Sequence, residues 1–222
     1  MTGTTGAVTT DARVLMRAAY ENRYTWDSNF PGYTADVTLT MDGKVHTGKV
    51  RVNPDLKAEV MDVEDEAAKK AIAEQAWEIA IHRVRREFEA THANNQFALG
   101  ETDETGAVEI IVEGKSTGDR YKVRDNKVVL VHRHIHGVVV TINTFTTHDT
   151  PEGYLSHTYD SVYHDPTTGE QKGGVSQFDD QYTKVGDYYV LTQRTITTEF
   201  HGKNHVNDFN FSNIALLQPA TV

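Results

Sequence analysis

The sequence predicts an α+β fold in which a curved antiparallel sheet, a half-open barrel, wraps around one long amphipathic helix. Two observations lead to this prediction. Between residues 64 and 92, apolar residues recur every three or four positions, which is the period of a helix. Most of the remaining chain alternates apolar and polar residues with short turns between the runs, and such connections produce antiparallel sheets.

The chain is expected to begin with a tail and a short N-terminal helix. Residues 1–9 are small and polar and are interpreted as a flexible tail, which leaves a single domain at residues 10–222. Thr10 is a suitable cap for the short helix, because its hydroxyl can accept a backbone N–H. The aromatic-rich segment from Tyr24 to Tyr33 is too irregular for a helix and is expected to tuck against the sheet.

Strands are predicted on both sides of the long helix. Residues 33–41 alternate strictly, Asp42-Gly43 supplies a two-residue hairpin turn, and residues 44–52 return as the partner strand. A third strand is expected at 56–63. After the helix, strands are predicted at residues 106–113, 121–124, 127–135, 138–145, 154–164, 174–184, 187–200 and 206–217.

The long helix is predicted to pack through one apolar stripe. Its members are spaced by three or four residues and are Ala73, Trp77, Ile81, Val84 and Phe88, and Ala76 and Ala80 broaden it. Packing against the sheet is the favoured interpretation of this stripe, and a ligand platform formed by Trp77 is the alternative.

Composition excludes several classes of function. The formal net charge of -10 disfavours binding to nucleic acid or to anionic membranes. The absence of cysteine excludes disulfides and thiolate chemistry. No secretory signal and no apolar run long enough for a bilayer are present, so a cytoplasmic protein without membrane insertion is expected, and no feature indicates its oligomeric state.

Three alternating histidines form the most specific pattern in the sequence. His132, His134 and His136 would share one face of a strand, with neighbours about 6.6 Å apart. Two such neighbours can bind one divalent first-row metal ion, so His132 and His134 are the candidate ligands. A third ligand would have to come from elsewhere, and the available donors are His148, His157, His164, Asp160 and Glu199.

Two other interpretations of the histidine strand stay open. A metal-free acid/base role would make His136 or His157 the catalytic candidate, because an imidazole with a pKa of about 6.5 exchanges protons near neutral pH. Alternatively, the histidines form an ordinary polar face. Gly-rich phosphate loops and the His-Glu-x-x-His motif are absent, and Asp179-Asp180 is interpreted as facing solvent.

Aromatic side chains are the candidates for contact with a small-molecule ligand. They are Trp26, Phe30, Tyr33 and Tyr159. Rings and hydroxyls on a sheet can line a pocket and orient a ligand. For Tyr159 the alternative is cross-strand packing with another aromatic residue.

Several segments resemble a family of uncharacterised proteins that is best represented in cyanobacteria and plastids. The resemblance runs from about Asp11 to Ala220 and is carried by residues 18–26, 29–33, 106–110, 152–154, 185–190 and 209–213. It implies no activity. Its strand pattern is similar to the half-open barrel of lipoprotein carriers, a likeness of architecture alone, and the histidine strand departs from the family's pattern.

These observations leave two functional hypotheses. The first is a soluble protein that holds an apolar or amphipathic small molecule in the hollow between sheet and helix. The alternative is a metal-dependent or histidine acid/base enzyme that uses the histidine strand. The first is preferred because it requires only the fold.

Overall fold

The computed structural model describes residues 11–218, so the predicted tail and Thr10 lie outside the described residues. The cap of the first helix is Asp11, not the predicted Thr10, because the Asp11 side chain accepts the backbone N–H of Arg13 at 2.7 Å. Three helices are present in this range: α1 (Ala12–Glu21), α2 (Glu66–Arg83) and α3 (Phe88–His92). The strands are β1 (Tyr33–Met41), β2 (Lys44–Val52), β3 (Ala58–Met61), β4 (Asn95–Thr102), β5 (Val108–Gly114), β6 (Arg120–Arg124), β7 (Lys127–Ile135), β8 (Val138–Thr144), β9 (Thr147–Thr150), β10 (Gly153–Ser156), β11 (Thr158–His164), β12 (Gln171–Val185), β13 (Tyr188–Phe200) and β14 (Lys203–Leu216).

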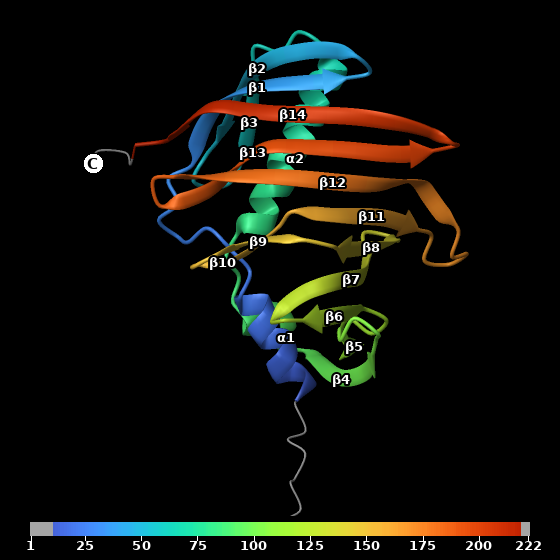
Figure 1. The fold of residues 1–222 in the computed structure, drawn as a ribbon. Helices are drawn as coiled ribbons and strands as arrows, with labels where there is room; N and C mark the ends of the chain where they lie inside the picture. Colours follow the sequence, from blue (N-terminus) through green and yellow to red (C-terminus); the bar gives the residue numbers. More distant parts are fainter. Residues whose placement is uncertain (1–10, 219–222) are drawn as a thin grey trace, which may run out of the picture.

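A single open sheet dominates the molecule (Figure 1). Its twelve strands follow the order β3-β2-β1-β14-β13-β12-β11-β8-β7-β6-β5-β4, while β9 and β10 form a separate two-stranded sheet. Neighbouring strands pair in antiparallel fashion, which confirms the predicted class of sheet. The predicted hairpin turn is also confirmed, because Asp42 and Gly43 have φ angles of 51° and 74°.

The predicted long helix is wrong. The chain leaves the helical conformation after Arg83, and Val84 is extended with φ -60° and ψ 126°. The N–H of Trp26 donates to the carbonyl of Arg83 at 2.6 Å, and Trp26 and Val84 form an isolated parallel bridge. The N-terminal aromatic segment therefore pairs with the end of α2 and terminates it.

The predicted apolar stripe of the helix is wrong in its line of large side chains, whereas its extension to Ala76 and Ala80 is confirmed. Trp77 is 58% exposed, and the residues of α2 that are buried are Ala68, Ile72, Ala76, Ile79 and Ala80. Three of the five are alanines, whose short side chains allow the helix backbone to approach the sheet closely. The helix therefore packs through the side that holds Ala76 and Ala80 together with Ile72 and Ile79, and Trp77 lies outside that side.

The break after Arg83 divides the apolar interior into two cores. The first core lies between α2 and strands β1, β2, β13 and β14, and includes Leu39, Ile72 and Phe209. The second core lies between α1, α3 and strands β5 and β6, and includes Met16 and Phe88. Because α2 and α3 serve different cores, one continuous helix would not fill both.

The helices share one face of the sheet, which we call the concave face; the opposite one is the outer face. Residues in register on neighbouring strands identify each face. Tyr121, which belongs to the second core, is opposite Val131, which is opposite Ile142. The same row continues through β11 and β12 to Thr198 on β13. None of the helices within residues 11–218 has the length and apolar character that crossing a membrane requires.

A buried histidine closes the second core. His92 is stacked edge-on against Tyr20 at 5.3 Å, and its ring lies 4.9 Å from that of Phe88. Its Nδ1 is 3.2 Å from the amide nitrogen of Asn95. Burial, and secondarily the nearby Arg133, lowers the pKa of His92 from 6.5 to about 4.

Acid is therefore expected to weaken the fold through His92. The folded state resists protonation of this ring while the unfolded state accepts it, so the stability is complete above pH 6.5 and is lost as the pH falls towards 4. The largest loss corresponds to about 3 kcal/mol. Denaturant unfolding of His92→Gln between pH 7 and 4 should show a correspondingly smaller pH dependence, whereas the exposed control His205→Gln should follow the unmodified protein.

Candidate functional site

A buried ion pair lies on the concave face beside α2. Arg194 on β13 and Asp180 on β12 are directly opposite in register and are 4% and 1% exposed. The guanidinium donates from Nε to Oδ1 at 2.8 Å and from Nη2 to Oδ2 at 2.7 Å. This two-point contact compensates two charges that are costly to remove from water.

Two tyrosines complete the coordination of this pair. The Tyr159 hydroxyl accepts a hydrogen bond from Nη2 of Arg194 at 2.8 Å and donates to Asp180 at 3.2 Å. The Tyr182 hydroxyl lies 3.1 Å from the same carboxylate and accepts from Arg83, the last residue of α2, at 2.9 Å. Burial raises the pKa of Tyr159 well above its ordinary value, so both tyrosines are neutral hydrogen-bonding groups at physiological pH.

The same arginine attaches α2 to the sheet. Nη1 of Arg194 donates to the side chain of Gln75 at 2.8 Å and lies 3.5 Å from the Glu78 carboxylate. Burial raises the pKa of Glu78, and Arg194 opposes that effect. Burial also opposes the charge on Arg194, but Tyr159 and Asp180 raise its pKa well above the ordinary value, so the guanidinium stays charged.

The interpretation of Asp179-Asp180 as facing solvent is therefore wrong for Asp180. The sequence carried a signal that was missed: Asp180 alternates with Phe178 and Tyr182, both of which pack against the first core. Arg194 likewise alternates with the buried Ile196. Charged residues at inward positions on two strands indicate a buried pair.

The four aromatic candidates for ligand contact are packed. Trp26, Phe30 and Tyr33 are buried in the first core, with Trp26 and Phe30 stacked at 3.9 Å. Tyr159 stacks on Phe178 of the neighbouring strand at 4.5 Å with an interplanar angle of 3°. In this structure these rings fill the interior and do not line an open hollow.

The histidine strand lies on the outer face. His132 Nδ1 is 2.8 Å from the Thr141 hydroxyl, and His134 Nδ1 is 3.2 Å from the Asp119 carboxylate. The two rings are 5.9 Å apart. His136 does not continue this face, because β7 ends at Ile135 and His136-Gly137 forms the turn to β8 with φ angles of 51° and 78°.

The third ligand required by the metal hypothesis is not found. Within residues 11–218, no group of three or more His, Cys, Asp or Glu side chains is placed to hold a metal ion. The predicted strand 154–164 is interrupted at His157, between β10 and β11. His157 instead lies 4.3 Å from the ring of His148 and 3.1 Å from the hydroxyl of Thr146.

A serine motif also lies near His134. The segment Gly114–Gly118 has the Gly-x-Ser-x-Gly pattern of hydrolase nucleophiles, with Ser116 at its centre. In that motif the serine stands between a strand and a helix, whereas Ser116 lies in the turn between β5 and β6. Among the described residues its hydroxyl has no hydrogen bond to a histidine, so the motif does not assemble a triad here.

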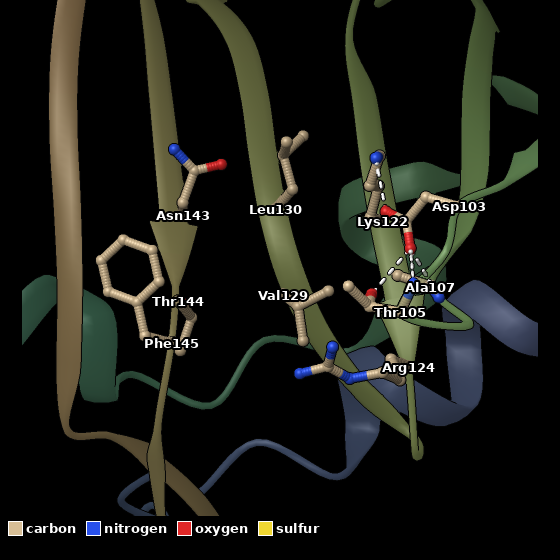
Figure 2. Close-up of a pocket in the computed structure, with 10 residues that line it drawn as sticks. All are labelled: Asp103, Thr105, Ala107, Lys122, Arg124, Val129, Leu130, Asn143, Thr144 and Phe145. Atoms are coloured by element: carbon tan, nitrogen blue, oxygen red, sulfur yellow. Dashed lines mark hydrogen bonds and ion pairs between the residues drawn. The ribbon is translucent and has the colours of Figure 1, made fainter.

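Two surface depressions lie away from α2. The first, of about 270 Å³, is on the outer face (Figure 2), where Leu130 and Phe145 provide apolar surface and Lys122 binds Asp103 at 2.6 Å. The second, of about 300 Å³, lies where α1 meets the link between α2 and α3. It is lined by Tyr20, Glu21, Arg23, Thr25, Arg85, Arg86, Glu87 and Phe88.

The concave face is not fully covered by its helices. Tyr163 on β11 and Phe200 on β13 are 44% and 43% exposed. Burial nevertheless raises the pKa of Tyr163, with Glu78 as the second cause. His82, exposed on the flank of α2, has its pKa lowered to about 4 by desolvation and then by neighbouring arginines.

Sequence comparison identifies the family. The model of DUF3386, described as a protein of unknown function, matches residues 7–217. The chain belongs to this family. The match confirms the resemblance to an uncharacterised family over nearly the whole chain. No curated protein matches the sequence.

Two solved structures are similar to this DUF3386 chain at low identity. A domain from Vibrio parahaemolyticus, assigned provisionally as an outer membrane lipoprotein-sorting protein domain, is 10% identical, with 93% of this chain and 92% of that chain covered and a TM-score of 0.31. A DUF1329 family protein from Desulfovibrio piger is 8% identical, with 93% and 94% covered and a TM-score of 0.28.

Removing one partner of the buried ion pair should destabilise this DUF3386 protein severely. Asp180→Ala leaves the Arg194 guanidinium buried and unpaired, so we expect a loss of about 3–5 kcal/mol in the free energy of unfolding. The double variant Asp180→Leu/Arg194→Met removes both charges and should recover at least half of that loss. Chemical denaturation measures both.

The exposed pair of Lys70 and Glu74 provides the control for this experiment. Its atoms are 3.8 Å apart and both side chains are well exposed, so Glu74→Gln should change stability by less than about 0.5 kcal/mol. An Asp180→Ala variant that is as stable as this control would show that the buried pair does not hold α2 against the sheet.

Proposed function

We propose that this protein binds a small amphipathic molecule on the part of the concave face that α2 leaves uncovered. The observation that carries the proposal is the exposure of two large rings, Tyr163 and Phe200, on a face that is otherwise packed. Apolar surface of this kind on a soluble domain is typical of a binding site.

Exposure along β13 marks where the helix ceases to cover the sheet. Arg194, Ile196 and Phe200 point to the same face because they alternate along one strand. Their exposed fractions rise from 4% to 9% and then to 43%. Figure 1 shows the same boundary, with β12, β13 and β14 extending well past α2. The uncovered surface is therefore continuous with the first core.

Polar groups are interspersed with these rings. Ser176 and Thr198 form a hydroxyl pair at 2.8 Å between β12 and β13. Ser161 on β11 is opposite Ser176 in register, and Tyr163 follows two residues later. Rings beside a row of hydroxyls suit a ligand that has both an apolar and a polar part, which supports an amphipathic ligand over a purely apolar one.

Shortening the two exposed rings should weaken ligand binding. Each half-exposed ring would contribute about 1 kcal/mol of apolar burial to a bound alkyl chain. The double variant Tyr163→Ser/Phe200→Ser should therefore bind decyl maltoside at least tenfold more weakly in isothermal titration calorimetry, below the micellar concentration.

Exposed apolar residues on the outer face provide matched controls. Phe145 is 57% exposed and lines the outer depression, and Val206 is 48% exposed on β14. Phe145→Ser/Val206→Ser should leave the affinity for decyl maltoside within a factor of two. Equal losses in the two double variants would contradict a site on the concave face.

A further inference from the structure

We infer that the polar group of this ligand is anionic and that Arg133 binds it, an inference that rests on the proposed function.

Arg133 lies beside the uncovered apolar surface. It is opposite Val140 on β8, and Val140 is opposite Tyr163 on β11. The three residues therefore form one row on the concave face, with Arg133 and Tyr163 about 10 Å apart at their Cα atoms. A ligand whose chain covers the Tyr163 ring would bring its polar end within reach of the Arg133 side chain.

Most of the donors of Arg133 are available. Its Nε lies 3.4 Å from Oδ2 of Asp119, and its side chain is 39% exposed. The other carboxylate oxygen, Oδ1, accepts the backbone N–H of His134 at 2.9 Å. Among the described residues, neither terminal nitrogen of Arg133 has an acceptor. These two nitrogens can bind both oxygens of a carboxylate or phosphate group.

Most carboxylates of this region already bind a neighbouring arginine. Asp180 is held by Arg194, and Asp119 is 4% exposed beneath Arg133. Glu78 is the partly accessible acidic group nearby, and it lies beside Arg194. The charge of Glu78, which acts on Tyr163, is opposed by that of Arg194.

Cationic groups surround the same region. Desolvation is the main cause of the low pKa of His82, and the guanidiniums of Arg83, Arg194, Arg23 and Arg133 lower that pKa further. Arg23 also lines the depression at the junction of the helices. Arg194 is buried and paired with Asp180, so Arg133 supplies the accessible positive charge beside the apolar surface, and this charge favours a ligand with an anionic head and an apolar chain.

The test compares three probes that share a decyl chain: decanoate, decyl maltoside and decyltrimethylammonium. Each is titrated calorimetrically below its micellar concentration against the full chain. We expect decanoate to bind at least tenfold more tightly than the uncharged maltoside, and the cation to bind most weakly. The preference for decanoate should shrink as salt is raised from 0.02 to 0.5 M, because screening weakens the attraction.

Two variants assign the effect to Arg133. Arg133→Gln should weaken decanoate binding about tenfold and leave maltoside binding within a factor of two. Arg120→Gln is the matched control, because Arg120 is on the neighbouring strand β6, opposite His132 on the outer face. It removes the same charge from the other side of the sheet and should leave both affinities unchanged.

Each outcome has one meaning. Equal binding of the three probes would overturn the anionic ligand while the proposed function stands. Equal losses in Arg133→Gln and Arg120→Gln would overturn the role of Arg133. If none of the three probes binds, the proposed function itself fails. Thermal unfolding of both variants separates a loss of contact from a loss of fold.

Discussion

The architecture depends on one constraint, which is that a single connection must carry the chain from one edge of the sheet to the other. β3 and β4 are consecutive strands, yet they occupy opposite edges of the twelve-stranded sheet. The distance across twelve strands is about 53 Å. Eighteen residues of helix span only about 27 Å, so α2 cannot cover the whole face. A second core and an uncovered region both follow from this mismatch.

The Arg194–Asp180 pair holds α2 at the boundary between covered and uncovered sheet. A hydrophobic contact there would give no preferred orientation to the flank of the helix. The bidentate ion pair and its bonds to Gln75, Tyr159 and Tyr182 fix that flank relative to β11, β12 and β13. A rigid boundary of this kind allows the adjoining surface to remain open without the helix closing over it.

Sequence reasoning recovered the sheet better than the helices or the site. Strict alternation in residues 33–41 and the Asp42-Gly43 turn were sufficient to predict β1 and its partner, because strand period and turn chemistry are local properties. The end of α2 was not predictable in this way, since it depends on Trp26, which is far away in the sequence. The buried Asp180 was missed because its partner, Arg194, is on another strand. Tyr159 and Tyr163 share one face of β11, but only the extent of α2 reveals that the first ring is covered and the second is not.

The extended link after Arg83 has a consequence for how the protein unfolds. α1 precedes β1 in the chain, yet it packs in the second core with residues 88–131. In the order of the large sheet, β11 and β8 lie between the strands of the first core and those of the second. Such a protein behaves as two cooperative units along a shared sheet, and backbone amides on either side of the uncovered region would exchange with solvent at separate rates.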